Sequence, residues 1–275
     1  MKHLFTLLLL LLLVACDKSE PEPAYITVEG ALSTETGERE VELAVMEVWI
    51  FVDDTFLGAY DLPARIPVLA SGTTEVELRW GIRVDGRSQV PDIYPFYEPI
   101  LRTIDLVPGS TTDLGVLPVT YSAETNIIIN ENFEPGSQRI FTDIIRGEGG
   151  LEVSTENVYQ GQASGKITLS PDNIAVEVAS RDTYSGLTDQ MRGNVWIEVT
   201  FQSDIPVIWG IVGILPGSGF SRFYDPGFNP STTWQKIYFN VTAAVGTSLL
   251  EDYNFSLFTS VADAEVMEGT VFLDN

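Results

Sequence analysis

The chain has 275 residues and carries 39 acidic residues against 15 basic ones, a formal net charge of −24. A charge this negative repels the phosphate backbone of DNA and RNA, which excludes nucleic acid as a partner. The only histidine and the only cysteine are His3 and Cys16, so residues 17–275 contain neither. This excludes Ser-His-Asp and Cys-His catalysis, structural zinc and iron–sulfur ligation from that part of the chain.

Residues 1–15 are predicted to form a signal peptide. Lys2 supplies the positive charge near its start, and the apolar stretch Leu4–Ala15 has 12 residues, fewer than the roughly 20 that a membrane-spanning helix needs. The segment Leu13-Val14-Ala15-Cys16 resembles the lipobox of bacterial lipoproteins. This resemblance implies cleavage before Cys16 and lipidation of its thiol by acyl chains that anchor the protein in a membrane. The alternative is a signal peptide that merely contains a cysteine near its cleavage site.

The residues after the cysteine are polar, rich in proline and without an apolar face, so residues 16–24 are predicted to be a short tether. The acidic residues just after Cys16 resemble the surface-export signal of lipoproteins from glycan-foraging Gram-negative bacteria. Asp17 also resembles the inner-membrane retention signal of enterobacteria. We expect the first location, the outer membrane of a Gram-negative bacterium, with the lipid-anchored protein facing the cell exterior.

Residues 25–122 show the alternation of apolar and polar residues that is typical of strands, in short runs separated by turn residues. The turns Asp53-Asp54-Thr55 and Asp85-Gly86 are the main hairpin signals. About seven short strands predict an immunoglobulin-like β-sandwich. The clearest predicted strands are Val41–Val45, Val48–Val52, Phe56–Tyr60, Thr74–Trp80 and Leu114–Val119.

The periodic pattern lapses near Tyr121–Thr125, and a second series of strands begins after it. Residues 126–275 therefore form a second predicted domain, a two-sheet jelly roll. The sequence as a whole predicts an all-β protein of two tandem β-sandwich domains behind a signal peptide and a tether. The strands predicted for the second domain are Leu151–Val153, Ala163–Leu169, Ile174–Ala179, Asn194–Gln202, Val207–Leu215, Trp234–Val241, Asn254–Ser260 and Thr270–Leu273.

Four segments of the second domain resemble the galactose-binding-like jelly rolls found in carbohydrate-binding modules: Asn132–Glu134, Val153–Ser164, Thr233–Phe239 and Val271–Asn275. The resemblance implies a glycan-binding role, although many proteins with this fold bind no sugar. It also implies a structural Ca²⁺ held by Glu134 and Asp274 with carbonyl groups of residues 159–161. The alternative is that both carboxylates lie at solvated strand ends, and no cofactor is required in either case.

The first domain is similar to PEGA-like and other immunoglobulin-like envelope domains. The likeness lies in Ile50–Gly58, Leu62-Pro63 and the stretch from Gly72 to Trp80, and it implies a scaffold rather than a reaction. The aromatic cluster Tyr94-Pro95-Phe96-Tyr97 has two interpretations. It is either a docking patch for a protein partner or a cover for the base of the sandwich near the domain junction.

Residues 217–228 are predicted to be a Gly- and Pro-rich loop that carries four aromatic rings, an arginine and an aspartate. Aromatic rings on a loop can stack on sugar rings, with the charged side chains as hydrogen-bonding anchors. The other interpretation is a loop folded over the edge of the sandwich with its rings turned inward. Trp196 and Trp234 are predicted to lie in the core, and the position of Trp209 is left open. The candidate ligand-binding residues are Phe220, Arg222, Phe223, Tyr224, Asp225 and Phe228.

These features predict a non-catalytic, lipid-anchored outer-membrane lipoprotein whose jelly roll binds a glycan. The alternative is an accessory scaffold subunit of an outer-membrane transport, secretion or assembly complex that docks protein partners. A remote alternative is a glycoside hydrolase, because that reaction needs two carboxylates and no histidine. The residues mark no particular catalytic pair.

Overall fold

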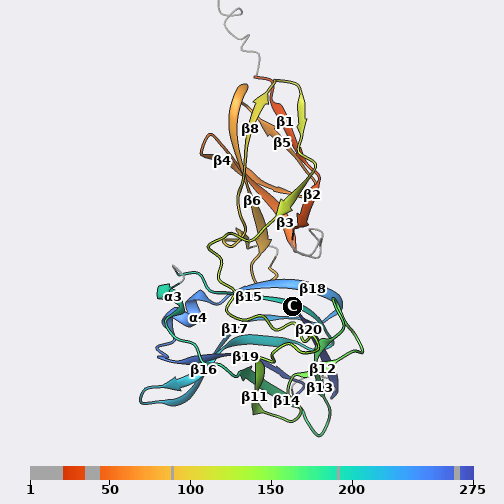
Figure 1. The fold of residues 1–275 in the computed structure, drawn as a ribbon, viewed down its shortest axis with the longest axis vertical. Helices are drawn as coiled ribbons and strands as arrows, with labels where there is room; N and C mark the ends of the chain where they lie inside the picture. The colour runs from red at the N-terminus through yellow and green to blue at the C-terminus, as the bar shows by residue number, and fades with distance from the viewer. Residues whose placement is uncertain (1–20, 35–43, 88–89, 191–192, 263–266) are drawn as a thin grey trace, which may run out of the picture.

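The computed structural model describes residues 21–34, 44–87, 90–190, 193–262 and 267–275. The predicted signal peptide, Cys16 and most of the tether lie outside these residues, as does most of the predicted strand Val41–Val45. The described chain is almost entirely β-structure, which confirms the predicted all-β class. Two β-sandwich domains follow one another along the long axis of the molecule (Figure 1). No helix among the described residues is long and apolar enough to cross a membrane.

The N-terminal domain contains strands β1 to β10, which form three small sheets. The turn at Asp53 and Asp54 has both residues in the left-handed region, with φ of 46° and 62°, and Val52 pairs with Thr55, which confirms the predicted hairpin turn and gives it a two-residue loop. The strands of the N-terminal domain alternate buried and exposed residues around one apolar core. The sheets have the orders β5 (Ala64–Val68)–β1 (Ala24–Val28)–β9 (Thr111–Asp113), β10 (Val116–Val119)–β2 (Gly30–Ser33), and β4 (Thr55–Asp61)–β3 (Val45–Val52)–β6 (Gly72–Arg83)–β7 (Pro91–Ile93), with β8 (Ile100–Leu106) also pairing with β6.

The C-terminal domain consists of two five-stranded antiparallel sheets that face each other, as expected for a jelly roll. We call them the β17 sheet and the β15 sheet. Short helices α3 (Leu187–Gln190) and α4 (Thr242–Thr247) lie at one end. The β17 sheet has the order β11 (Phe141–Arg146)–β14 (Ala175–Ser180)–β19 (Tyr253–Ser260)–β16 (Val207–Leu215)–β17 (Gly219–Phe228), and the β15 sheet has the order β12 (Glu152–Ser154)–β13 (Ser164–Leu169)–β20 (Gly269–Asp274)–β15 (Trp196–Ser203)–β18 (Ser231–Asn240).

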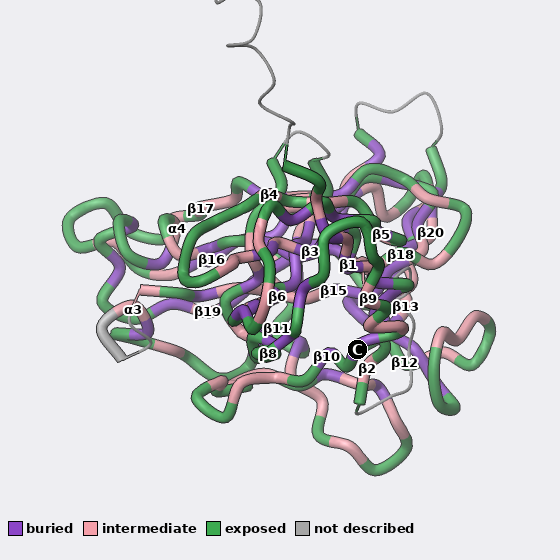
Figure 2. Tube along the Cα trace, turned by 90° about the horizontal axis from the view of Figure 1, so that it is seen from above, coloured by how far each residue is buried: buried purple, intermediate pink, exposed green. Residues whose placement is uncertain are grey.

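The core of the C-terminal domain lies between the two sheets. Seen along the long axis, buried segments occupy the centre and exposed loops surround them (Figure 2). Trp209 is buried in this core with its ring edge-on to that of Phe141 at 5.6 Å. Trp234 lies instead on the outer side of β18 and donates from Nε1 to Asn157 Oδ1 at 3.2 Å. The prediction that Trp234 is a core residue is therefore wrong, because alternation along β18 turns its neighbours Ile237 and Phe239 inward.

The aromatic cluster at residues 94–97 covers the domain junction, in agreement with the second of its two interpretations. The Tyr94 ring lies 5.4 Å from Trp196 and 4.7 Å from Tyr238, both of the C-terminal domain. Tyr97 and Tyr238 share a hydrogen bond of 2.8 Å between their hydroxyl groups. Trp196 therefore packs against the core of the N-terminal domain, not within its own sandwich as predicted.

Glu198 connects the two domains through polar contacts at the same junction. Its Oε1 accepts hydrogen bonds from the hydroxyl groups of Tyr94 at 2.6 Å and Tyr121 at 2.8 Å, and its Oε2 pairs with Lys236 Nζ at 3.0 Å. Burial, reinforced by the Glu198 charge, raises the pKa of Tyr94 and of Tyr121. Both phenols therefore stay protonated and can donate over the whole physiological pH range.

Candidate functional site

The segment predicted as an aromatic loop is strand β17, at the edge of its sheet. The expectation of a loop is wrong for residues 219–228, which pair with β16 along most of their length. An edge position tolerates the proline, because only one side of such a strand needs to donate hydrogen bonds. The register shifts where Asp225 and Pro226 have no partner on β16, as in a β-bulge.

Strand alternation divides the six candidate residues between two faces. Phe220, Arg222 and Tyr224 lie on the outer face of the sheet. Phe223 packs against the core, and Phe228 is buried there with its ring stacked on Phe201 at 3.7 Å. Asp225 is exposed at the bulge. The structure therefore brings three of the six candidates together and turns the rings of Phe223 and Phe228 toward the interior.

The outer face is organised around a buried carboxylate, that of Glu177 on β14. Its side chain is only 2% exposed and receives two hydrogen bonds from Arg222, from Nε to Oε1 at 2.7 Å and from Nη2 to Oε2 at 3.0 Å. The Tyr224 hydroxyl donates to Oε1 at 3.0 Å and also shares a 2.7 Å hydrogen bond with Ser256. Burial raises the pKa of Tyr224, and the hydrogen bond to Glu177 raises that of Arg222.

Two small residues allow side chains from β17 to reach across the sheet to β14. Gly210 on β16 pairs with both Tyr224 and Ser256, and it lies beneath the Tyr224 ring. A Cβ atom at Gly210 would lie 2.8 Å from Tyr224 Cδ1 and 2.0 Å from the Phe223 carbonyl oxygen. Tyr224 can therefore lie over the middle strands because the two positions beside it hold glycine and serine.

Further rings and a second guanidinium flank this network. Phe220 is 46% exposed and lies 4.8 Å from the Arg222 guanidinium, measured to the ring centroid. Phe258 lies 6.4 Å from Tyr224 and carries the Arg146 guanidinium 5.7 Å above its ring. Exposed ring faces beside fixed hydrogen-bond donors are suited to hold flat, polyhydroxylated molecules by stacking and hydrogen bonding.

Sequence reasoning missed Glu177, Ser256, Phe258 and Arg146. One signal was available, since Glu177 is the only charged residue in the apolar run Ile174–Ala179. A charge in a strand whose other residues are apolar must find a partner. The partner comes from β17, three strands away, and no sequence pattern gives that pairing.

The two carboxylates proposed as calcium ligands lie on either side of one loop. Glu134 Oε1 accepts from the backbone N–H of Gln162 at 2.7 Å, and Asp274 Oδ2 accepts from the N–H groups of Tyr159 at 3.0 Å and Gln160 at 3.1 Å. Asp274 is buried, which raises its pKa to about 6. Its second oxygen, Oδ1, is buried without a hydrogen-bond partner.

That orphan oxygen fits a cation, because Ca²⁺ prefers carboxylate and carbonyl oxygens. The described residues contain no group of three or more His, Cys, Asp or Glu side chains that could hold a metal ion. Glu134 and Asp274 would therefore supply the only carboxylates, and the remaining ligands would have to be carbonyl groups or water.

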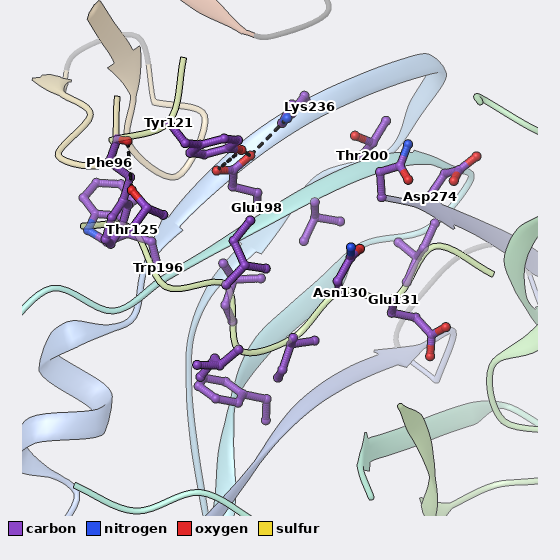
Figure 3. Close-up of a pocket in the computed structure, with 18 of the residues that line it drawn as sticks. Phe96, Tyr121, Thr125, Asn130, Glu131, Trp196, Glu198, Thr200, Lys236 and Asp274 are labelled. Atoms are coloured by element: carbon purple, nitrogen blue, oxygen red, sulfur yellow. Dashed lines mark hydrogen bonds and ion pairs between the residues drawn. The ribbon is translucent and has the colours of Figure 1, made fainter. Parts of the chain in front are cut away.

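A cavity of about 380 Å³ lies at the domain junction (Figure 3). Residues 125–131, which lead into the C-terminal domain, form one wall, and residues 194–200 of β15 and the segment before it form another. Figure 3 shows Glu198 directed toward Tyr121 and Lys236 at one end of the cavity and Asp274 at the other. Apolar side chains of the C-terminal core also line it, among them Phe133, Phe141, Leu151, Trp209 and Phe255.

No protein-family profile matches this chain, and no curated protein matches it. Among solved structures, it is similar to carbohydrate-binding modules of the β-sandwich superfamily with promiscuous specificity, at 15% identity and a TM-score of 0.37, covering 93% of this chain and 97% of that chain. It is also similar to the C-terminal family 22 carbohydrate-binding module of Clostridium thermocellum Xyn10B, at 15% identity and a TM-score of 0.33, covering 54% of this chain and 89% of that chain. A family 30 carbohydrate-binding module is similar as well, at 12% identity and a TM-score of 0.36, covering 48% of this chain and 84% of that chain. With identities and TM-scores this low, the function proposed below depends on the geometry of the chain's own residues.

Proposed function

We propose that the C-terminal domain binds a glycan on the outer face of the β17 sheet without altering it chemically. The observation that carries the proposal is the continuous face formed by Phe220, Tyr224 and the Arg222–Glu177 pair. Phe220 offers an exposed ring for stacking on the C–H groups of a pyranose. Glu177 accepts from only two of the five N–H groups of Arg222, which leaves the others to donate to sugar hydroxyls.

The same network argues for binding over catalysis. Both oxygens of Glu177 accept hydrogen bonds from Arg222. A general acid must instead carry a proton and present it to the glycosidic oxygen. A carboxylate saturated by a guanidinium is suited to orient that guanidinium and the neighbouring Tyr224, which places donors at defined positions for the ligand.

Affinity gel electrophoresis on a panel of soluble polysaccharides tests this proposal. The wild-type protein should be retarded by at least one polysaccharide, and Phe220→Ala should weaken binding about fivefold, since one stacked ring contributes about 1 kcal/mol. Phe56→Ala is the matched control, because Phe56 is 48% exposed but lies on the N-terminal domain. If no polysaccharide retards the wild-type protein, or if both variants behave like it, glycan binding on this face is refuted.

We also propose that Cys16 is lipidated and anchors the protein in the outer membrane, facing the exterior. The first strand begins at Ala24, so the eight residues 16–23 span at most roughly 30 Å. The C-terminal domain would then lie beyond the N-terminal one as seen from the membrane. Cys16→Ser should abolish acylation and release the protein from the membrane fraction, and continued membrane retention would contradict the assignment. Protease accessibility on intact cells distinguishes the external from the periplasmic leaflet.

A structural Ca²⁺ at Glu134 and Asp274 is a third proposal, independent of the glycan site. It is supported by the buried, unpartnered Asp274 Oδ1 and by the shared 159–163 loop that both carboxylates contact. The ion would tie that loop to the last strand, β20. Its role would be stability and not ligand contact, because Asp274 lies on β20 of the β15 sheet and Arg222 on β17 of the other sheet.

A further inference from the structure

A second group of aromatic side chains lies on the outer face of the β15 sheet. Phe272 on β20 pairs in register with Gln202 on β15, and Trp234 lies on the outer side of the next strand, β18. Two strand spacings of about 4.8 Å place Phe272 and Trp234 roughly 10 Å apart. The Tyr159 ring, from the loop before β13, lies 5.7 Å from that of Trp234. All three rings are partly exposed.

The N-terminal domain covers a different part of this face. Its Tyr94 ring packs on Trp196 and Tyr238. Trp196 is the first residue of β15, whereas Gln202 is next to the last, and Trp234 lies in the first half of β18. Because β15 and β18 are antiparallel, the rings of the second group lie toward the end of both strands that is farther from the domain junction.

Polar side chains beside these rings are held in one orientation by a chain of hydrogen bonds. The Trp234 indole donates from Nε1 to Asn157 Oδ1 at 3.2 Å, and an indole N–H can only donate. Asn157 therefore presents Nδ2 as a donor, and this atom reaches Gln202 Oε1 at 3.0 Å. Gln202 in turn donates from Nε2 to the Thr232 carbonyl at 2.8 Å. The indole thus fixes the direction of both amide groups.

Each of these amide groups keeps a donor for a ligand. A side-chain amide has two N–H bonds, and Asn157 and Gln202 each use one of them in the chain of hydrogen bonds. The second N–H has no acceptor among the described residues, and both side chains are partly exposed. A fixed donor beside an exposed ring suits a sugar, because a hydroxyl can accept from the amide while the C–H groups of the pyranose stack on the ring.

The charges on this face favour an uncharged ligand. The Lys166 ammonium lies 5.7 Å from the centroid of the Phe272 ring and is paired with Glu156 Oε2 at 2.6 Å. That pair is neutral as a whole, and the two amide groups carry no charge. The chain has a net charge of −24, which disfavours a polyanion.

We propose that this outer face of the β15 sheet is a second glycan site, which takes a neutral oligosaccharide extended across β18, β15 and β20. One sugar ring stacks on Trp234 and Tyr159 and another on Phe272, while hydroxyl groups between them accept from Asn157 and Gln202. The two sheets face each other across the core, so this site and the one proposed on the β17 sheet point in opposite directions. A domain with both sites can hold two glycan chains at once.

Heteronuclear NMR of the protein tests this inference, with cellohexaose, xylohexaose and mannohexaose as neutral probes and hexagalacturonate as an anionic probe. At least one neutral hexasaccharide should shift the indole signal of Trp234 and the side-chain amide signals of Asn157 and Gln202. Tyr159→Ala should weaken this binding about fivefold, because it removes one stacked ring. Tyr25→Ala is the matched control, since Tyr25 is a partly exposed tyrosine on β1 of the N-terminal domain.

The inference is overturned if no neutral hexasaccharide shifts the Trp234 indole signal, or if hexagalacturonate shifts it equally. It is also overturned if a folded Tyr159→Ala variant binds as tightly as Tyr25→Ala. The backbone spectrum shows whether the variant is folded, and the shifts in the wild-type protein decide the matter if it is not.

The Phe220→Ala variant distinguishes this site from the one proposed on the β17 sheet. It should leave the shifts at Trp234 intact. Shifts confined to the neighbourhood of Phe220 and Tyr224 would overturn the second site and support the first. Shifts confined to the neighbourhood of Trp234 would do the reverse.

Discussion

Arg222 at the edge of the β17 sheet donates two hydrogen bonds to Glu177, three strands away on β14. The arginine side chain is 45% exposed, whereas the glutamate side chain is 2% exposed. The pair thus spans the outer face from solvent to interior. The partly exposed partner neutralises the buried one, and Tyr224 completes the arrangement by donating to the same carboxylate.

This difference in burial predicts an asymmetric response to substitution. Arg222→Ala leaves the Glu177 charge buried and should lower the free energy of unfolding by about 2–4 kcal/mol. Glu177→Gln leaves Arg222 free to reach water and should cost only about 1 kcal/mol. Urea denaturation measures both values. Arg102→Ala is the control, because Arg102 is exposed and, among the described residues, hydrogen-bonds only to the neighbouring Leu101 carbonyl. Equal losses for the two test variants would refute the asymmetry.

Gly210 supports the flat position of Tyr224, and Gly210→Ala tests that relationship. The added methyl would contact Tyr224 Cδ1 and the Phe223 carbonyl, so we expect a loss of about 1–3 kcal/mol of stability and weaker glycan binding. The control is Gly246→Ala in α4, where a Cβ would meet only Thr188 Cγ2 at 3.4 Å. Thermal unfolding should show a lower melting temperature for Gly210→Ala than for Gly246→Ala. A Gly210→Ala variant as stable as the control would show that the sheet relaxes without displacing Tyr224.

The stability of the domain junction should depend on the carboxylate of Glu198. Glu198→Ala removes the acceptor shared by Tyr94 and Tyr121 and leaves both partly buried hydroxyl groups without it. We expect the free energy of unfolding to fall by about 2–4 kcal/mol. In calorimetry the two domains should then unfold in separate transitions. Glu75→Ala, at an exposed position on β6, should unfold like the wild type. A single unshifted transition for Glu198→Ala would mean that the aromatic contacts alone hold the junction.

Asp274 predicts how stability changes with pH. Its pKa is raised from 3.8 to about 6 by burial, so the folded protein binds this proton more tightly than the unfolded chain does. The resulting stabilisation is fully present below pH 3.8 and is lost as the pH rises through about 6. Without a cation, therefore, this carboxylate makes the protein less stable at pH 8 than at pH 5.

Calcium should reverse that loss if it binds at Asp274. We expect Ca²⁺ to raise the melting temperature more at pH 8 than at pH 5, because the ion requires the ionised carboxylate. Asp274→Asn should remove both the Ca²⁺ effect and the contribution of this residue to the pH dependence, as measured by differential scanning fluorimetry with and without EDTA. An equal Ca²⁺ shift in the Asn variant would place the ion elsewhere.

The sequence predicted the local parts of this fold well. Strands such as Val48–Val52 and Val207–Leu215 were identifiable because alternation and β-branched residues are properties of neighbours along the chain. Hairpin turns such as Asp53-Asp54 were identifiable for the same reason. Strand β17 was missed because its glycines and Pro226 resemble a loop, and only an edge position with a bulge accommodates them.

The absence of histidine and cysteine after residue 16, the strong negative charge and the all-β class could be read from the sequence alone, because they depend on composition and local pattern. The candidate sites could not. Glu177 meets Arg222 through a contact that spans four neighbouring strands of the β17 sheet. Such relationships are decided by sheet order and register, which bring together residues far apart in the chain.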